Sequence, residues 1–277
     1  MSQKSHTIRS AALIIIFSVF SFNGFAHSQL SVISWNLKDL GISKSDAEIG
    51  MIARTLNPYD VVAVQEVVAG PDGPKAVARL ADALNRKGVK WEYEISAVTS
   101  GSSAHKAERY AFFWQSAKVS RIGKGWLEDR FGLEIEREPF YGRFRVGETT
   151  ITLVNFHAIT RSKQPETEVK YFKFLPARYP VDNLIFCGDF NLPQSHSVFN
   201  PLKSMGFRSA LVKQKTTLRQ RCIGDGCLAS EFDNFYYDSA KLSLKVAGVI
   251  HFYRLLPDIA KARMVSDHIP IFAVYQL

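Results

Sequence analysis

The stretch NLIFCGDFN, residues 183–191, is a short apolar run that ends in two polar side chains, Asp189 and Asn191. An apolar run of this length that stops at a turn is typical of a buried β-strand. The same pattern recurs along the chain, and we expect strands at residues 30–36, 60–66, 91–98, 109–115, 141–146, 149–158, 232–238, 242–251 and 269–277. The chain is therefore rich in strands that carry aromatic or branched side chains.

Helical spacing is confined to a few segments between these strands. Residues 44–56 repeat apolar side chains on one helix face, with Ser45 or Asp46 as the N-cap, and residues 73–88 show the same spacing. Two further helices are expected at residues 166–178 and 195–205. Many strands with few helices favour an α/β fold in which stacked sheets carry helices on the outside.

The N-terminus predicts a secretory signal peptide. Lys4 and Arg9 precede an almost wholly apolar run at residues 11–22, and the small residues Ala26 and Ser28 follow at the two positions that a signal peptidase reads. A membrane anchor is the alternative, but the run is shorter than the ~20 residues that span a bilayer. We therefore expect cleavage between Ser28 and Gln29, no stable membrane span, and a secreted or periplasmic protein.

The mature chain is basic. The net charge of the full chain is +9, and removing residues 1–28 takes away Lys4 and Arg9 and no acid, which leaves +7. A basic exported protein suggests a polyanionic partner, although the charge would also serve solubility alone. The basic residues are densest at Arg208, Lys213, Lys215, Arg219 and Arg221.

The cysteines suggest an oxidising compartment. Cys222 and Cys227 bracket a short glycine-rich loop, a spacing that predicts a local disulfide before Asp233. A metal site is the alternative, and it lacks a second Cys or His pair nearby. Cys187 lies within an apolar strand and is expected to be a buried free thiol.

Polar residues gather at the ends of the predicted strands. A carboxylate or imidazole at a strand tip is either solvated or directed into a cleft, and several together indicate a site. These residues are Asn36, Glu66, His157, Asp189, Asn191, Asp233 and His268. Their oxygen ligands, with Asp267, suit Mg²⁺, Mn²⁺ or Ca²⁺ better than zinc. His157 and His268 supply acid–base capacity, and Glu108 and Asp233 are carboxylates available to orient them.

At these motifs the chain resembles the endonuclease/exonuclease/phosphatase superfamily and, within it, the deoxyribonuclease I branch. The matching motifs are SWNL (34–37), VVAVQEV (61–67), HKAERYAFFW (105–114), EREPF (136–140), LVNFHA (153–158), CGDFN (187–191), SEFDNF (230–235) and SDHIPI (266–271). The resemblance implies that residues 29–277 form one domain, a four-layer α/β sandwich of two packed mixed sheets with helices outside.

The resemblance also implies roles for the site residues. Glu66 resembles the main metal-binding carboxylate, supported by Asn36 and Asp267. Asp189 and Asn191 resemble the pair that positions the attacking water and the scissile phosphate. The remaining roles are those of proton transfer and phosphate binding, and Arg137 resembles a phosphate-binding arginine. His268 with Asp233 and His157 with Glu108 resemble the two histidine–carboxylate pairs, and the sequence leaves open which histidine is the base. We assign His268 as the base and His157 as the acid or phosphate ligand.

The implied activity is metal-dependent hydrolysis of DNA phosphodiesters to 5′-phosphate products, with Mg²⁺ or Mn²⁺ as the cofactor, duplex DNA as the partner and a monomeric enzyme. One departure is Val68, which stands where the deoxyribonuclease branch has an arginine that enters the minor groove. That contact is missing or supplied elsewhere, for example by Lys106 or residues 208–221. The calcium sites of the animal enzyme have no match here.

Three other functions fit parts of the sequence. A secreted sphingomyelinase shares the fold and would need an exposed apolar hairpin, for which residues 246–260 are the candidate; a strand running into a helix is the other interpretation of that segment. An inositol-phosphate phosphatase shares GDFN and SDH, but REPF argues against it. A non-enzymatic binding module would be expected to lose site residues, and none is missing.

Overall fold

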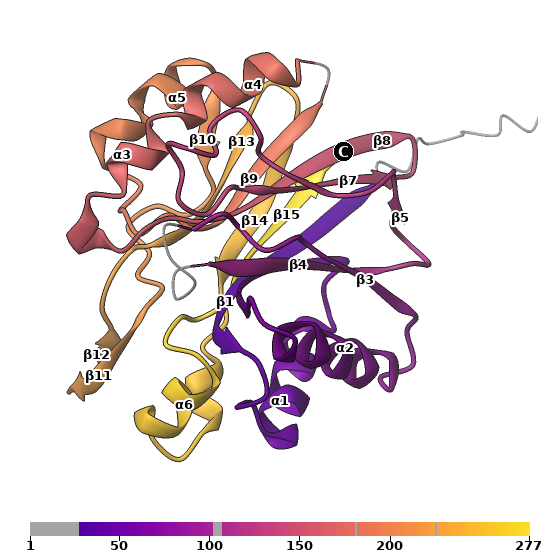
Figure 1. Cartoon of the computed structure of the whole chain (residues 1–277), viewed down its shortest axis with the longest axis vertical. Helices are drawn as coiled ribbons and strands as arrows, with labels where there is room; N and C mark the ends of the chain where they lie inside the picture. Colours follow the sequence, from indigo (N-terminus) through magenta and orange to yellow (C-terminus); the bar gives the residue numbers. More distant parts are fainter. Residues whose placement is uncertain (1–27, 102–106, 181, 225) are drawn as a thin grey trace, which may run out of the picture.

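The computed structural model describes residues 28–101, 107–180, 182–224 and 226–277, so the predicted signal peptide, up to residue 27, lies outside the described residues, as does Lys106. Two large sheets pack face to face (Figure 1). The six-stranded sheet has the order β14 (Ser243–Val249), β15 (Ile271–Gln276), β1 (Gln29–Leu40), β2 (Val61–Val68), β4 (Glu108–Gln115), β3 (Trp91–Ile95).

The seven-stranded sheet has the order β10 (Phe207–Ser209), β13 (Asp233–Asp238), β9 (Asn183–Asp189), β8 (Thr149–His157), β7 (Phe140–Val146), β5 (Ser120–Arg121), and β6 (Trp126–Leu127) also pairs with β7. Both sheets are mixed: β1 and β2 are parallel, β8 and β9 are parallel, and the other pairs are antiparallel. A separate hairpin is formed by β11 (Leu218–Ile223) and β12 (Gly226–Leu228).

Helices cover the outer face of each sheet. The six-stranded sheet carries α1 (Asp46–Leu56), α2 (Asp72–Asn85) and α6 (Ile259–Val265). The seven-stranded sheet carries α3 (Glu166–Val169), α4 (Leu175–Arg178) and α5 (Asn200–Ser204). Three buried apolar clusters lie between the resulting layers, one between the sheets and one under each set of helices. The four-layer sandwich expected from the sequence is thus confirmed.

Two predicted helices are broken into shorter pieces. Residues 166–178 form α3, a 3₁₀ turn at Phe172–Phe174 and α4, and residues 195–205 form a 3₁₀ turn at Ser197–Phe199 and α5. Pro176 and Pro201 explain the breaks, because proline has no N–H to donate and is tolerated only in the first turn of a helix. By contrast α1 begins as expected at the N-cap Ser45, which forms a reciprocal capping box with Glu48.

The segment proposed as an apolar hairpin is ordered differently. Its first residues belong to β14, a 3₁₀ turn follows at Phe252–Leu255, and α6 begins at Ile259. Phe252 is buried under the six-stranded sheet, where its ring packs against Trp35. Residues 246–260 therefore form a strand, a turn and the start of a helix. Among the described residues, no helix is both long and apolar enough to cross a membrane.

Candidate active site

The site lies where the inner faces of both sheets reach one end of the sandwich. Successive side chains along a strand point to opposite faces of the sheet. A residue two positions after a buried inner-face residue therefore points into the same layer between the sheets. On β8 and β9 the inner face runs through Leu153 and Cys187 toward His157 and Asp189. On β4 it runs back to Glu108. The alternation of side chains along each strand therefore directs His157, Asp189 and Glu108 into one cleft.

Three of these residues lie side by side on neighbouring strands. His157 on β8 is paired with Asp189 on β9, and Asp189 is paired with Asp233 on β13. Gly188 permits this alignment: its φ is +130°, and a Cβ there would lie 2.0 Å from the carbonyl oxygen of Phe156. Only glycine fits so close to β8, which explains the glycine of the GDFN motif in physical terms.

Glu66 reaches the site through an irregularity in β2. The pairing with β4 shifts between Val64 and Val67, so β2 holds one extra residue there, and Glu66 adopts a left-handed backbone with φ of +59°. Val64 and Val67 both face the helices, whereas in a regular strand Glu66 would share the face of Val64. The bulge therefore turns Glu66 toward the cleft, as bulges beside active sites often do.

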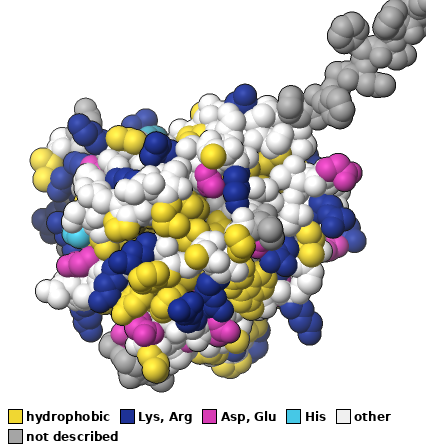
Figure 2. Space-filling view, turned by 90° about the horizontal axis from the view of Figure 1, so that it is seen from above, with side chains coloured by type: hydrophobic (Ala, Val, Ile, Leu, Met, Phe, Trp, Pro, Cys, Tyr) yellow, Lys and Arg dark blue, Asp and Glu magenta, His cyan; other side chains and the backbone are white. Residues whose placement is uncertain are grey.

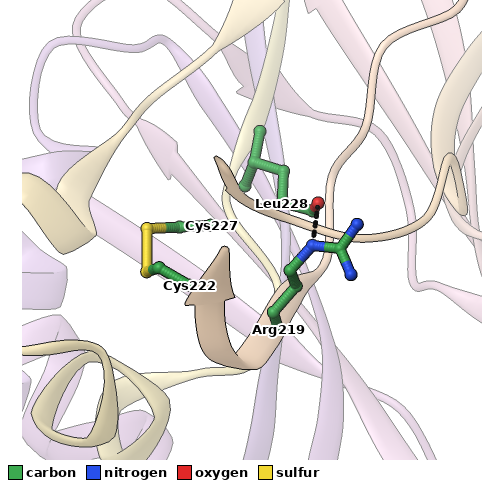
Figure 3. Close-up of a disulfide and its surroundings, with 4 residues drawn as sticks. All are labelled: Arg219, Cys222, Cys227 and Leu228. Carbon is green, nitrogen blue, oxygen red and sulfur yellow. Dashed lines mark hydrogen bonds between the residues drawn. A yellow bond between two sulfur atoms is a disulfide. The ribbon is translucent and has the colours of Figure 1, made fainter. Parts of the chain in front are cut away.

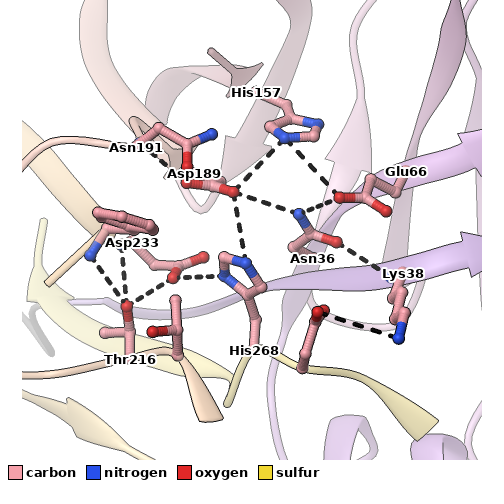
Figure 4. Close-up of polar contacts among 12 residues, drawn as sticks. Asn36, Lys38, Glu66, His157, Asp189, Asn191, Thr216, Asp233 and His268 are labelled. Atoms are coloured by element: carbon pink, nitrogen blue, oxygen red, sulfur yellow. Dashed lines mark hydrogen bonds and ion pairs between the residues drawn. The ribbon is translucent and has the colours of Figure 1, made fainter. Parts of the chain in front are cut away.

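Each histidine is oriented by its own carboxylate. His157 Nδ1 lies 2.9 Å from Oε2 of Glu108. His268 Nδ1 lies 2.8 Å from Oδ2 of Asp233, as Figure 4 shows. In both pairs this leaves Nε2 directed at Asp189, whose Oδ2 is 3.5 Å from His157 and 3.6 Å from His268. The structure thus brings together the two pairs that the sequence predicts, with Asp189 between them.

Asn36 links the carboxylates at the centre. Its Nδ2 donates to Oε1 of Glu66 over 2.7 Å and to Oδ2 of Asp189 over 3.3 Å. The backbone N–H of Lys38 donates to the Oδ1 of Asn36 over 3.0 Å. Two carboxylate oxygens from different sheets therefore converge on a single amide nitrogen.

Burial shifts the pKa values of the site in opposite directions. Burial raises the pKa of Glu108 to about 8 and also raises the pKa of Glu66. Burial and the charge of Arg137 lower the pKa of His157 to about 4. Burial also disfavours the charged form of His268, but the nearby Asp233 and Asp189 outweigh it and raise the pKa of His268 to about 10.

Arg137 and Asn191 hold the end of β8. Arg137 donates from Nε to the His157 carbonyl over 3.0 Å and from Nη2 to the Ala158 carbonyl, and its Nη1 lies 3.5 Å from Oε2 of Glu108. Asn191 donates from Nδ2 to the same Ala158 carbonyl over 3.0 Å, and its N–H donates to Oδ1 of Asp189 over 2.9 Å. Arg137 lines the cleft and Asn191 adjoins Asp189, but much of the hydrogen-bonding capacity of both side chains is directed to the protein.

Asp267 is placed differently from the other predicted metal ligands. Its Oδ2 accepts from Nη2 of Arg263 over 3.3 Å and lies 4.0 Å from the Nζ of Lys38. It is neutralised by these two cations at the rim of the cleft, whereas Glu66 and Asp189 share the amide of Asn36. Hydrogen bonds therefore join Glu66, Asn36 and Asp189 to one another, whereas Asp267 contacts Arg263 and Lys38 instead.

Sequence reasoning missed two hydroxyl groups that hold the site. Thr216 donates to Oδ2 of Asp233 over 2.6 Å and accepts from the Asp233 N–H over 3.1 Å. Ser266 donates to the Asn36 carbonyl over 2.6 Å and accepts from the His268 N–H over 2.9 Å. Ser266 lies within the SDH motif, but nothing in the sequence links Thr216 to Asp233.

The residues fit a hard divalent cation. Glu66 and Asp189 offer oxygen ligands within reach of one Asn36 nitrogen, and the raised pKa of Glu66 marks a carboxylate that lacks sufficient positive charge nearby. Ligand atoms of Asp189, Asp233 and His268 also lie within 4.8 Å of one another, but Asp233 and His268 already bind each other through Nδ1. Glu66 and Asp189 are therefore the better ligand pair.

A cleft of about 400 Å³ opens over Glu66, Glu108 and His157. Its walls include Val68 at the end of β2, the next two residues, Ala69 and Gly70, and Thr160 beyond β8. No lysine lines this cleft among the described residues, and Arg137 is its cationic wall. An anionic group that enters the cleft would therefore meet Arg137, the carboxylates and any cation that they hold.

Comparison with known proteins agrees with this geometry. Residues 33–268 match the endonuclease/exonuclease/phosphatase family. A deoxyribonuclease from Thioalkalivibrio sp. (strain K90mix) is 27% identical over 296 aligned residues, which cover 98% of this chain and 77% of that protein. Human deoxyribonuclease gamma is 27% identical over 201 residues, covering 66% of this chain and 64% of the human protein.

The fold also matches solved structures. A family protein from Bacteroides thetaiotaomicron superimposes with a TM-score of 0.66 at 15% identity, covering 91% of this chain and 98% of that one. The family match spans the residues of both histidine–carboxylate pairs and most of both sheets. The chain therefore belongs to the endonuclease/exonuclease/phosphatase family.

Proposed function

We propose that this protein is an exported, divalent-cation-dependent deoxyribonuclease that cleaves duplex DNA with little sequence preference and acts as a monomer. The observation that carries the proposal is the position of Asp189 between two carboxylate-oriented histidines, with Nε2 atoms 3.5 and 3.6 Å from one of its oxygens. Phosphodiester hydrolysis needs one group to take a proton from water and another to give a proton to the leaving oxygen. This site holds both groups on either side of one carboxylate.

The bound cation would be held by Glu66 and Asp189, with Asn36 beside them. It would offset negative charge on the phosphate and lower the pKa of nearby water and of both imidazoles. Asp189 and Asn191 would position the water and the phosphate, because Asp189 faces both histidines and Asn191 extends from the same turn. Arg137 would offer its charge from the cleft wall while it holds the end of β8.

His268, oriented by Asp233, is proposed as the base that accepts the proton of the water. Asp233 and Asp189 hold the ring protonated in the cation-free site, so this role requires positive charge that offsets Asp189. His157, oriented by Glu108, is proposed to protonate the departing 3′-oxygen. A phosphate bound beside His157 would raise the low pKa of its ring and favour the protonated form. The P–O3′ bond breaks, and the products carry a 5′-phosphate and a 3′-hydroxyl.

Charge and the names of the relatives support DNA as the substrate. Two relatives that cover most of this chain are deoxyribonucleases by name. Figure 2 shows one face of the molecule on which Lys and Arg side chains are spread widely and Asp and Glu are fewer. Binding through many phosphate contacts carries no base information, so we expect weak sequence preference.

Export is supported by the disulfide between Cys222 and Cys227, because such bonds persist in oxidising compartments. The N-terminal pattern that suggests a signal peptide points the same way. Sphingomyelin hydrolysis is supported less, since residues 246–260 form part of β14, a turn and the start of α6 with Phe252 buried.

The test offers supercoiled plasmid, RNA and sphingomyelin vesicles in parallel, each with Mg²⁺ and with a chelator. We expect nicking of the plasmid that depends on Mg²⁺ or Mn²⁺ and falls steeply between ~50 and ~200 mM salt, because phosphate contacts release counterions. Faster turnover of vesicles than of plasmid, with a flat salt profile on DNA, would replace this proposal with the lipid phosphodiesterase.

A further inference from the structure

The β11–β12 hairpin begins directly beside the candidate active site. Thr217 forms a β-bridge with His268, and the N–H of the next residue, Leu218, donates to the Asp267 carbonyl over 2.7 Å. From this root the hairpin projects beyond the body of the sandwich (Figure 1). The hairpin and the base machinery thus share one short stretch of hydrogen-bonded backbone.

The root of the hairpin is firmly anchored. Leu218 is 4% exposed and belongs to the buried cluster under the six-stranded sheet, and Leu228 packs against that cluster. Arg263 of α6 donates to the Leu218 carbonyl over 2.7 Å. The Cys222–Cys227 disulfide joins the two strands farther out (Figure 3). Because the hairpin is fixed at both places, its side chains are presented in a defined position.

The hairpin and the segment before it carry cations that form no ion pair with any acid that the structure describes. Residues 213–224 contain Lys213, Lys215, Arg219 and Arg221 and no acid, and none of these cations forms a salt bridge with a described acidic side chain. Arg219 donates from Nε to the Leu228 carbonyl over 3.0 Å, and its two Nη groups have no acceptor among the described residues (Figure 3). Asp225, at the tip, lies outside the described residues.

The catalytic cleft is poor in cations on its other wall. Val68, Ala69 and Gly70 line that wall, and the site itself is rich in carboxylates that repel a polyanion. Arg219 and Arg221 lie on the strand that follows the Thr217–His268 bridge, and their charge would offset this repulsion.

We propose that Lys213, Lys215, Arg219 and Arg221, on β11 and the segment just before it, form a cationic arm that binds the phosphate backbone of the substrate DNA a few nucleotides from the scissile phosphate; this inference rests on the proposed nuclease function. Arg219 and Arg221 follow Thr217 by two and four residues, about 7 and 13 Å along an extended strand. A duplex advances about 3.4 Å per base pair. The arm therefore contacts phosphates about two to four nucleotides from the cleavage point.

The test compares Arg219→Gln/Arg221→Gln with a matched control, Arg86→Gln/Lys87→Gln. The control residues are exposed and follow α2, whose C-terminal end leads to the strand end paired with Gln115, away from the site. We expect the arm variant to raise the KM for plasmid DNA about 10-fold and to flatten the slope of log KM against log salt by about 2. Hydrolysis of bis(p-nitrophenyl) phosphate, which is too small to reach the arm, should equal the wild-type rate, and the control should match the wild type throughout.

A binding measurement without catalysis separates the contribution of the arm to DNA affinity from any contribution to the rate of cleavage. Anisotropy of a fluorescent 20-base-pair duplex, measured in EDTA, should show a Kd about 10-fold higher for the arm variant than for the wild type or the control. Equal Kd values and salt slopes for all three proteins overturn the arm. The arm also fails if its variant loses retention on phosphatidylglycerol vesicles while DNA binding is unchanged, since Ile223 at the exposed tip would then mark a membrane contact. A wild type that binds DNA through the arm but cleaves none overturns the proposed nuclease and leaves the arm standing.

Discussion

Thr216 donates its hydroxyl hydrogen to Asp233 over 2.6 Å, at the same oxygen that receives Nδ1 of His268. The hydroxyl oxygen in turn accepts from the Asp233 N–H, so the carboxylate is held from two sides. The orientation of the His268 ring therefore depends on a buried threonine that is not among the residues lining the cleft.

Thr216→Val should impair turnover while the fold survives, because valine keeps the shape and removes the hydroxyl. A lost hydrogen bond to a charged group costs on the order of 1.5–3 kcal/mol, so we expect kcat on plasmid DNA to fall at least ~10-fold. KM should change little, and the pH–rate profile should shift because the Asp233 charge is less well held. Thr216→Ser should restore the rate and the profile. A purely structural role would instead lower the melting temperature and leave the pH profile of the folded fraction unchanged.

Cation affinity should rise with pH. The raised pKa values of Glu66, of Glu108 (about 8) and of His268 (about 10) mean that the cation-free site binds protons at neutral pH. These protons compete with Mg²⁺ and leave as the pH rises through the raised values, so binding of Mg²⁺ releases protons. The Mg²⁺ concentration for half-maximal activity should therefore be lower at pH 9 than at pH 7. Activity titrations at both values test this, and a pH-independent midpoint would count against the site.

The strands and most of the candidate site were predicted from apolar runs that end in polar residues and from the order of the motifs. An apolar strand with inner-face parity dictates where His157 and Asp189 point, and the motif order supplies their partners. The sequence could not predict that the Glu66 side chain turns toward the cleft. Its direction depends on a β-bulge with a left-handed backbone at Glu66, and the apolar run around it looks like that of a regular strand. Thr216 was missed for a related reason: its contact with Asp233 depends on the path of the loop between them, which sequence spacing does not determine.

The helices over the seven-stranded sheet were also predicted only in part. The segments were placed correctly, but Pro176 and Pro201 divide them into short turns. The predicted disulfide is present, and its place in the fold is specific. The bond joins the outer part of the hairpin, whereas Asp233 is held at the root by Thr216.

Lys44 should contribute to stability through α6. Its side chain is buried and its Nζ donates to the carbonyls of Met264 and Val265, both over 2.8 Å, at the end of the helix that precedes Ser266. Lys44→Met keeps the apolar stem and leaves both carbonyls without this donor. We expect the free energy of unfolding to fall by about 1–3 kcal/mol. The exposed Lys261 of the same helix gives the control, since Lys261→Met should change it by less than about 0.5 kcal/mol. Urea titrations of both variants measure the difference.

Removing the disulfide should cost stability and little activity. The bond closes a short loop, so Cys222→Ser/Cys227→Ser should lower the free energy of unfolding by on the order of 2 kcal/mol. The variant should keep a higher kcat than Thr216→Val, because the Thr216 contact with Asp233 remains. A larger loss of kcat in the cysteine variant than in Thr216→Val would show that the disulfide, rather than Thr216, holds Asp233 in position. Alkylation and mass spectrometry of the exported wild type should find no free thiol at either position.

The most direct test of the central claim is the initial rate of plasmid nicking by four single variants, Glu66→Ala, His157→Ala, Asp189→Ala and His268→Ala, at fixed Mg²⁺ beside the wild type. Under the proposed function each variant removes a charge-stabilising or proton-transfer group from one cluster, so each should lower turnover by ~10²-fold or more. Melting curves establish that the fold survives, and a chelator should abolish wild-type nicking until Mg²⁺ or Mn²⁺ is restored. Near-normal nicking by folded His157→Ala and His268→Ala proteins would contradict the account.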